Sequence, residues 1–554
     1  MFLKNIEALK KVNKELADRL EKIDLEDIVS KFSFTMSPTN NYVLIKNDIA
    51  LDDLTDPVES ARLTLKNEIH QNLGDNDFII IFGLGLGYLL DETFETYKSK
   101  IILYEPDIDI LRFAFEYVDF SKHLESLRVL IVDDVTVCVN YLFEKYLLKD
   151  KVEVIYLKNY AITNVDKLTH LTQRVYDICK IKIVDMNTIK KLAKIWACNI
   201  LDNVKHKYEL LDSLSNKYSG KTAMILAAGP SLKDNIEQIK KYRDKFVIFA
   251  INRVFPTLQE HGIIPDYVVF SDAQYIKKSI HVEESFFKDV NIITDIKADQ
   301  YVYTLPCKQL YVYHPTNEAL SLKLRDSAGI ELFETAGTST ITAYLLARKM
   351  GFKNIAFCGF DLAFKYNIAY CDNTIAKVEA DSAMINSIVK NIIRVKSVNG
   401  QMVKTTDDYA VFIKQFEEIL KANGDTNVYG ITDFGAYIEG VKYVSVDDVA
   451  NLTQTKSIPL TEQKSSDYKK SVQNAVKEEK SALEDIKYHI NAKADERTII
   501  AKIMRTIFLS QCLQFELIDY TNIALSDDKD KKETFYKEFF EKTLKDIDTL
   551  LSHI

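Results

Sequence analysis

Six short apolar runs between residues 222 and 358 constrain the fold of this chain more than any other feature of its sequence. They cover residues 222–228, 246–250, 267–270, 291–294, 310–313 and 355–358, and none contains a charged side chain. Such runs are typical of strands that are buried on both faces of a parallel sheet. Because helix-length segments separate them, the pattern predicts an α/β fold with a doubly wound sheet.

Polar residues follow several of these predicted strands at the points where the strands end. In doubly wound sheets, ligands lie outside the carboxyl ends of the strands. The residues at these ends are Ser231, Asn252, Asp272 and Asp361. Their placement predicts a binding site, with Asp272 and Asp361 as the candidate catalytic carboxylates.

The turn after the first run reads Gly229-Pro230-Ser231 and leads into a segment compatible with a helix. Glycine lets the backbone approach a ligand, proline suits the first turn of a helix, and Ser231 offers a hydroxyl. The free N–H groups and the positive dipole end of the following helix favour a phosphate. An ordinary packing turn of the same composition is equally compatible with these residues.

A second helix entry is rich in small hydroxyl residues. Gly337, Thr338, Ser339 and Thr340 directly precede an apolar helical face that begins at Ile341. Small residues leave room for a bound group at the helix start, and their hydroxyls can donate hydrogen bonds to it. The alternative is a plain Ser/Thr N-cap without a ligand.

The last apolar run is followed by Gly359 and then by a loop over residues 362–374. Loops at the carboxyl ends of strands often carry mobile catalytic groups. Within this loop, Tyr370 and Asp372 are the candidate substrate-binding residues, and Gly359 is a candidate at the strand end.

The N-terminal region contains a separate glycine-rich turn. An apolar run at 78–82 leads into Gly83, Gly85 and Gly87, and a second run at 101–104 ends in Glu105. A glycine turn followed by an acidic residue is how S-adenosylmethionine methyltransferases and dinucleotide enzymes hold a ribose. Because the G-x-G-x-x-G spacing is incomplete, the sequence favours a Rossmann-like scaffold over a working nucleoside site.

Length and composition limit the remaining classes of protein. A chain of 554 residues is long enough for about three domains. A net charge of −9 argues against a nucleic-acid partner. Seven scattered cysteines without a C-x-x-C pair, together with the lack of an export signal or a membrane-spanning apolar run, predict a cytoplasmic protein without a zinc site.

A polar break ending in Pro459 suggests the last domain boundary. The predicted organisation has three parts: a Rossmann-like domain with a leading amphipathic helix at 1–185, a central α/β domain at 186–453, and a helical region at 454–554.

The motifs, in their order along the chain, resemble the motility-associated-factor (Maf) family of flagellin glycosyltransferases. The segments that carry this resemblance are FGLGLGY with the later YEPD, Gly229-Pro230-Ser231-Leu232, and residues 267–272, 337–347, 357–364 and 427–440. The likeness extends over roughly residues 40–450. The central domain also resembles bacterial sialyltransferases, whose Gly-Pro-Ser-Leu turn and strand-end asparagine match Ser231 and Asn252.

This resemblance implies a protein O-glycosyltransferase with a CMP-activated nonulosonic acid, such as pseudaminic or legionaminic acid, as the donor. The acceptor implied is a Ser or Thr hydroxyl of flagellin. Asp272 or Asp361 would orient or deprotonate this hydroxyl, or support charge on the sugar ring. No further cofactor is implied, no metal ligands are expected, and dependence on a divalent metal stays open, as does the oligomeric state.

The general base is a point of departure from the relatives. Sialyltransferases rely on a histidine, and members of the flagellin family often carry one after the Asp-Leu-Ala strand end. Here the corresponding loop reads Tyr370-Cys371-Asp372. His314, at the end of another predicted strand, is a candidate substitute, although its neighbour Pro315 suits an ordinary turn equally well.

Three other functions remain compatible with the sequence. The central domain also resembles archaeal pterin diphosphokinases, which use ATP. The N-terminal glycine turn is compatible with a methyltransferase. A flagellin-binding chaperone without catalytic activity is the third alternative.

Overall fold

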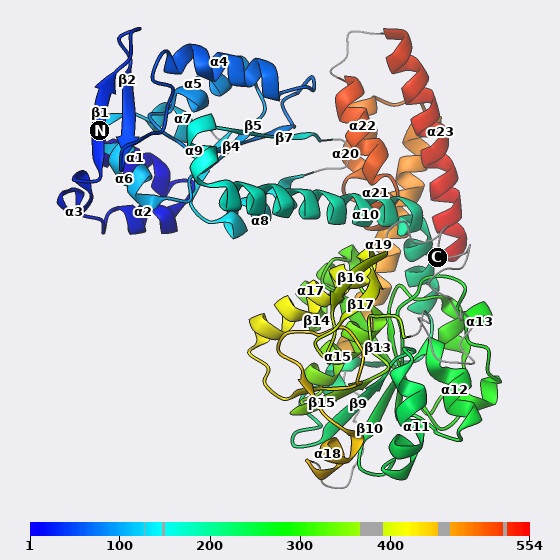
Figure 1. Cartoon of the computed structure of the whole chain (residues 1–554). Helices are drawn as coiled ribbons and strands as arrows, with labels where there is room; N and C mark the ends of the chain where they lie inside the picture. Colours follow the sequence, from blue (N-terminus) through cyan, green and yellow to red (C-terminus); the bar gives the residue numbers. More distant parts are fainter. Residues whose placement is uncertain (127, 147–149, 366–391, 453–465, 525–528) are drawn as a thin grey trace. The chain divides into compact units, whose positions relative to one another are not determined.

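The computed structural model describes residues 1–126, 128–146, 150–365, 392–452, 466–524 and 529–554 (Figure 1). Residue contacts divide the chain into two compact units, Met1–Ile189 and Lys190–Ile554. The predicted boundary at 185/186 lies close to this division, and the one predicted at 453/454 lies inside the second unit.

The first unit is built on a four-stranded parallel sheet in the order β6-β5-β4-β7. Its strands are β4 (Phe78–Phe82), β5 (Lys100–Tyr104), β6 (Val129–Val132) and β7 (Val152–Tyr156). All five residues of β4 are buried, as expected for a central strand that helices cover on both faces. A small antiparallel sheet joins β1 (Phe32–Met36), β2 (Tyr42–Lys46) and β3 (Ile49–Ala50).

Helices complete the first unit. They are α1 (Phe2–Lys10), α2 (Lys14–Leu20), α3 (Leu25–Val29), α4 (Pro57–Glu68), α5 (Tyr88–Thr96), α6 (Ile108–Tyr117), α7 (Ser121–Leu124), α8 (Val135–Lys145), α9 (Lys158–Thr163) and the first part of α10 (Val165–Asn203). The leading helix expected from the sequence is divided in two, because the Asn13 side chain accepts a hydrogen bond from the Leu16 N–H and begins α2.

The second unit contains a ten-stranded sheet, and every strand pairing in it is parallel. Its path is β14-β13-β12-β11-β10-β9-β15-β18-β19, with β8 beside β13. The strands are β8 (Glu209–Leu210), β9 (Thr222–Leu226), β10 (Val247–Ile251), β11 (Tyr267–Phe270), β12 (Asn291–Asp295), β13 (Gln309–Pro315), β14 (Leu332–Phe333), β15 (Asn354–Cys358), β18 (Val428–Ile431) and β19 (Lys442–Tyr443). All six apolar runs form strands of this sheet, so the predicted α/β class is confirmed.

Alternate residues of the central strands face two separate cores. In β9, Met224 and Leu226 belong to one buried cluster, and Ala223 and Ile225 belong to the other. Complete burial of a Leu or Ile side chain contributes about 1.5–3 kcal/mol, so a strand covered on both faces is held strongly in register.

Helices cover the sheet and form the C-terminal region. Those within the sheet domain are α11 (Ser231–Lys241), α12 (Phe255–Glu260), α13 (Ile276–Ser279), α14 (Ala319–Ala328), α15 (Ser339–Lys349), α17 (Asp407–Asn423) and α18 (Val446–Asn451), together with the hairpin β16 (Ile392–Lys396) and β17 (Met402–Thr406). The C-terminal helices are α19 (Ser466–Asn491), α20 (Glu496–Ile503), α21 (Phe508–Cys512), α22 (Gln514–Ala524) and α23 (Lys529–His553). Their apolar residues, such as Leu483 and Leu550, belong to the same buried cluster as Met224 of the sheet.

The strand order reverses beside β9. Strands β10 to β14 extend from one side of β9, whereas β15 and β18 lie on its other side. In open α/β sheets, this reversal is where ligands usually bind, outside the carboxyl ends of the strands. The carboxyl ends of β9 and β15 are therefore the position at which a ligand is expected in this fold.

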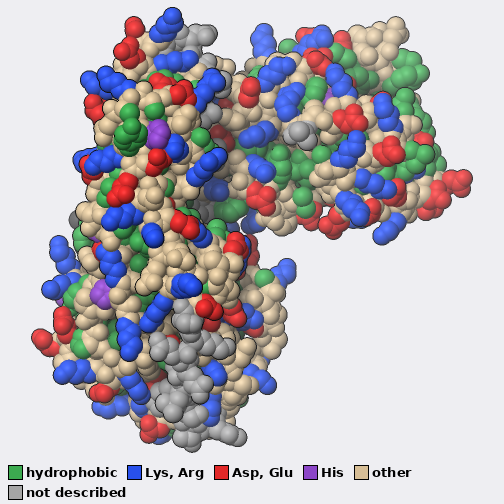
Figure 2. Space-filling view, turned by 180° about the vertical axis from the view of Figure 1, so that it is seen from behind, with side chains coloured by type: hydrophobic (Ala, Val, Ile, Leu, Met, Phe, Trp, Pro, Cys, Tyr) green, Lys and Arg blue, Asp and Glu red, His purple; other side chains and the backbone are tan. Residues whose placement is uncertain are grey.

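Two general properties of the described residues limit the classes of function. Within the described residues, no helix combines the length and apolar character needed to cross a membrane. On the face shown in Figure 2, Lys and Arg side chains are interspersed with Asp and Glu side chains.

Candidate functional site

The carboxyl ends of β9 and β15 are bonded directly to each other. The Gly229 N–H donates to the Gly359 carbonyl oxygen at 2.7 Å, and the Gly359 N–H donates to Ser231 Oγ at 2.9 Å. Gly359 has a φ of +79°, and a Cβ at this position would lie 2.0 Å from the Ala227 carbonyl oxygen. The place where the strand order reverses is therefore closed by its own backbone, and only glycine fits at residue 359.

Asp361 is buried beneath this closed turn, with 2% of its surface exposed. Its Oδ2 accepts a hydrogen bond from the Ser231 N–H at 2.9 Å, at the first residue of α11. Burial raises the pKa of the carboxyl from 3.8 to about 6, while hydrogen bonds from Ser231 and Thr432 act in the opposite direction. The carboxylate thus occupies the helix N-terminus where the sequence predicts a phosphate, and Asp361 lies inside the protein instead of at an open site.

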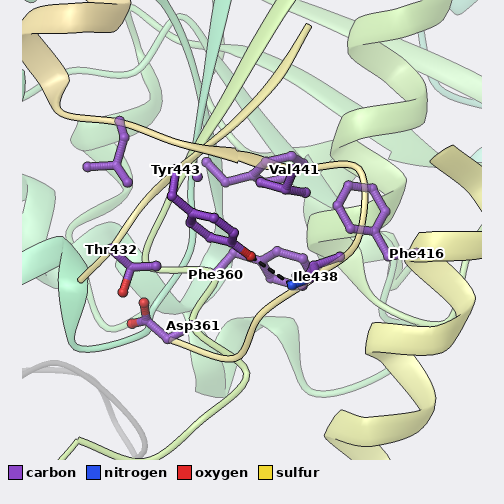
Figure 3. A pocket seen from close by; sticks show the side chains of 10 residues that line it. Phe360, Asp361, Phe416, Thr432, Ile438, Val441 and Tyr443 are labelled. Atoms are coloured by element: carbon purple, nitrogen blue, oxygen red, sulfur yellow. Dashed lines mark hydrogen bonds between the residues drawn. The ribbon is translucent and has the colours of Figure 1, made fainter. Parts of the chain in front are cut away.

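A small cavity adjoins Asp361. Figure 3 shows Asp361 beside Thr432, with Phe360, Phe416 and Tyr443 around the space. Its volume is about 10 Å³, which is close to the minimum that one water molecule needs. This cavity is too small for a nucleotide or a sugar.

Polar side chains, some exposed and some half-buried, gather one and two strands away from β9, at the ends of β10 and β11. We define the polar edge as the side chains of Asn252, Arg253, Ser271, Asp272, Thr338 and Ser339. Asn252 Nδ2 donates to Asp272 Oδ2 over a long 3.5 Å, and the Ser271 and Ser339 hydroxyls lie 3.0 Å apart. These bonds bring together the ends of two neighbouring strands and the start of α15.

Asp272 differs from Asp361 in its access to solvent. The Asp272 side chain is exposed. The side chain of Arg253 beside it is exposed too and carries the opposite charge. Partial enclosure by the surrounding strand ends raises the pKa of Asp272, while the charge of Arg253 and the bond from Asn252 act to lower it. An exposed carboxylate with a raised pKa is placed to accept a proton from an incoming group.

The four residues of the predicted helix entry at 337–340 have different environments in the structure. Thr338 Oγ1 accepts a hydrogen bond from the Ile341 N–H at 3.1 Å, so Thr338 is the N-cap of α15. Thr340 is buried, and the exposed Gly337 donates its N–H to Gln415 Oε1. Thr338 and Ser339 both belong to the polar edge, and it is Ser339 whose hydroxyl bonds Ser271.

The other predicted residues lie elsewhere. Gly229 and Pro230 are buried in the closed turn after β9. Tyr370 and Asp372 lie outside the described residues.

His314 is enclosed, and its proposed role as a base is wrong. It is 1% exposed, its Nδ1 bonds the Ser321 hydroxyl, and its Nε2 bonds the Tyr468 hydroxyl at 2.8 Å. Burial lowers the pKa of His314 to about 3. No acceptor can reach either ring nitrogen, because both are already bonded inside the protein.

Sequence reasoning missed two asparagines of α10 that hold the loops beside the polar edge. Asn199 Nδ2 donates to the Ala273 and Lys297 carbonyl oxygens at 2.9 and 3.0 Å. Asn203 Nδ2 donates to two further carbonyl oxygens after β12, at 2.9 and 2.8 Å. Both asparagines are buried on one helix face, and this i, i+4 pair of amides in a helical segment was the only signal available in the sequence.

The N-terminal glycine turn has the geometry of a nucleotide loop but is filled by the protein itself. Gly83 has a φ of +94°, and a Cβ there would lie 2.6 Å from the Tyr160 ring. Glu105 is fully buried and accepts hydrogen bonds from the Leu84 N–H at 2.9 Å and the Tyr160 hydroxyl at 2.5 Å. Burial raises the pKa of Glu105 to about 7. The carboxylate that would bind a ribose is bonded internally, which favours the scaffold interpretation.

Among the residues that the structure describes, no group of three or more His, Cys, Asp and Glu side chains is arranged to hold a metal ion.

Comparisons with known proteins bear on both the central domain and the whole fold. Residues 198–367 match the family model described as "6-hydroxymethylpterin diphosphokinase MptE-like". An uncharacterized protein of Treponema pallidum (strain Nichols) is 32% identical over 124 residues, which are 22% of this chain and 58% of that protein. The chain thus spans less than two thirds of the length of this relative.

A solved structure matches the chain over its whole length. It is the Maf glycosyltransferase from Magnetospirillum magneticum AMB-1, with a TM-score of 0.65, 16% sequence identity, and coverage of 100% of this chain and 95% of that one. At this identity, the likeness concerns the fold. The chain therefore has the fold of a Maf glycosyltransferase, as the order of its motifs predicts, and its central segment matches the MptE-like family model.

Proposed function

We propose that this chain is a glycosyltransferase that moves a nonulosonic acid from its CMP-activated form to a Ser or Thr hydroxyl of flagellin. The observation that supports this most is the exposed carboxylate of Asp272, which lies with Asn252 and Arg253 at the carboxyl edge of the parallel sheet. The likeness of the whole fold to a Maf glycosyltransferase supports the same reaction class.

The phosphate of the donor has a suitable place at the polar edge. Asp361 already neutralises the N-terminus of α11, so that helix has little to offer a second anion. The eleven-residue α15 begins at Ser339, and the positive end of its dipole faces the same edge as the Arg253 guanidinium. Arginine and helix N-termini both favour phosphate oxygens, and both stabilise the charge that grows on CMP as it departs.

The acceptor hydroxyl is activated by Asp272 in this proposal. The acceptor oxygen bonds to the anomeric carbon of the sugar while the bond from that carbon to the phosphate oxygen breaks. The hydroxyl proton passes to the Asp272 carboxylate, and the bonding electron pair leaves with CMP. A positioned general base of this kind contributes roughly 10²- to 10⁴-fold to a rate.

Two matched substitutions test these roles. Flagellin is made with the unaltered chain, with Asp272→Asn or with Asp361→Asn, in cells that supply the CMP-sugar, and its intact mass is measured. We expect the mass of the sugar to be lost with Asp272→Asn and kept with Asp361→Asn, because Asn at 361 still accepts the Ser231 hydrogen bond. Modification that persists with Asp272→Asn contradicts the assignment of the base, and unmodified flagellin with the unaltered chain contradicts the proposed reaction.

An ATP-dependent diphosphotransferase is the second candidate, because the MptE-like family model matches residues 198–367. Calorimetry of the full chain with CMP, and separately with ATP and Mg²⁺, distinguishes the two. Saturable binding of CMP supports the glycosyltransferase, and preferential binding of ATP with Mg²⁺ supports the diphosphotransferase. Binding of flagellin without either nucleotide supports a chaperone instead.

A further inference from the structure

The loop between β11 and α13 carries both Asp272 and an aromatic ring in an uncommon backbone conformation. Tyr275 has a φ of +63° and a ψ of 15°, in the left-handed region that residues other than glycine rarely adopt. Its side chain is 65% exposed. Within the part of the chain that the structure describes, this side chain makes no hydrogen bond, and Lys278 Nζ lies 5.6 Å from the ring centroid.

Three hydrogen bonds hold this loop in its shape. The Asp299 N–H donates to the Asp272 carbonyl oxygen at 2.9 Å, and Asp299 Oδ2 accepts from the Ile276 N–H at 3.1 Å. Between these two points, Asn199 Nδ2 donates to the Ala273 carbonyl oxygen. Both ends and the middle of the loop are thus fixed by hydrogen bonds in which the Tyr275 side chain takes no part.

Folding alone does not account for this arrangement. A large apolar ring gains little free energy while most of it faces water, and the left-handed backbone adds a cost that glycine or asparagine would avoid. Unfavourable backbone conformations that neighbouring groups enforce are concentrated at ligand sites. The exposed ring of Tyr275 is therefore accessible to a molecule outside the protein, on the same loop that carries Asp272.

The chemistry of the polar edge indicates which part of a ligand the ring meets. Arg253 and the start of α15 suit an anion, and Asp272 suits a hydroxyl. A nucleotide adds one further recognisable part, the flat π face of its base. Three residues of chain span at most about 11 Å, so the Cα of Tyr275 lies within about that distance of the Cα of Asp272, which is comparable to the length of one nucleotide.

We propose that Tyr275 is the stacking platform for the nucleobase of the donor nucleotide. This rests on the proposed function, since it assumes a nucleotide donor at the polar edge. Stacking of a base on an aromatic ring contributes about 1–3 kcal/mol, which corresponds to about a 5- to 150-fold change in Kd.

Calorimetry with CMP and with ribose 5-phosphate tests this assignment on the full chain. Tyr275→Asn removes the ring but suits the left-handed backbone, and Tyr275→Phe keeps the ring without the hydroxyl. Tyr488→Ala is the matched control, because Tyr488 is 70% exposed on α19 and is no part of the polar edge. We expect Tyr275→Asn to weaken CMP about 5- to 150-fold, with changes below about twofold for Tyr275→Phe and Tyr488→Ala.

Ribose 5-phosphate separates stacking from a change of loop shape, since it carries the sugar and phosphate without a base. Its affinity should be the same for the unaltered chain and Tyr275→Asn. If Tyr275→Asn binds CMP as tightly as the unaltered chain, or weakens both ligands equally, the stacking role is overturned while the glycosyltransferase proposal stands. If the unaltered chain does not bind CMP, both proposals fail.

Discussion

Replacing Asp361 with asparagine tests how the closed turn between β9 and β15 is stabilised. Asn at this position still offers an oxygen to the Ser231 N–H but cannot ionise. Burial raises the pKa of the Asp361 carboxyl from 3.8 to about 6 in the folded chain. The folded state therefore holds the proton more tightly than the unfolded state, which loses it first as the pH rises.

The sign and size of the pH effect follow from this difference. Below about pH 4 the Asp361 carboxyl is protonated in the folded and the unfolded chain, so its burial does not lower the free energy of unfolding. Between about pH 4 and pH 6 the unaltered chain loses stability as the pH rises, and above pH 6 the loss is constant. A shift of about two pKa units at about 1.4 kcal/mol per unit amounts to roughly 3 kcal/mol. The Asp361→Asn variant lacks this loss.

Urea unfolding at a series of pH values measures the effect. The chain has one tryptophan, Trp196, which lies half-buried in the second unit and reports the unfolding of that unit by fluorescence. Other buried carboxyl groups titrate as well, but their contributions cancel when the variant is compared with the unaltered chain at each pH. We expect the variant to gain up to roughly 3 kcal/mol relative to the unaltered chain between pH 4 and pH 7. A difference that stays constant over this range would refute the burial argument.

Three further substitutions in the second unit are tested by urea unfolding. Gly359→Ala should lower the free energy of unfolding by at least about 3 kcal/mol, because its Cβ would lie 2.0 Å from the Ala227 carbonyl oxygen. Gly262→Ala is the control: its Cβ meets no neighbour, and only the left-handed backbone lowers the free energy of unfolding, by about 1–2 kcal/mol. Equal losses at the two glycines would contradict the role of the close approach at Gly359. Asn203→Ala removes two hydrogen bonds to buried carbonyl groups after β12 and should cost about 2–3 kcal/mol, and a cost below about 0.5 kcal/mol would contradict the bracing role of α10.

The strands could be predicted from the sequence because apolar residues without charges mark burial on both faces. β9 and β10 each consist entirely of buried residues, and both were expected. The two-residue strands β8, β14 and β19 carry no such signature, because they are too short to form an apolar run. Strand order at the edges of the sheet depends on contacts that a local pattern does not contain.

The sequence identified the strand ends that carry the polar residues, but it did not show which of these residues are exposed and which are buried. Asp272 and Asp361 both follow a strand closely, yet one is exposed and the other is 2% exposed. The difference arises because β15 lies against β9, where the α11 N-terminus takes up the Asp361 carboxylate. His314 was misjudged for a similar reason, since Tyr468 encloses it from 154 residues further along the chain.

The filled glycine turn of the first unit has a thermodynamic consequence. A protein that binds a ligand only in its folded state becomes more stable as the ligand concentration rises. In this unit, the Tyr160 ring fills the space beside Gly83 and its hydroxyl bonds Glu105, and both contacts belong to the folded chain itself. The contribution of these internal contacts to the stability of the unit is therefore independent of any ligand concentration.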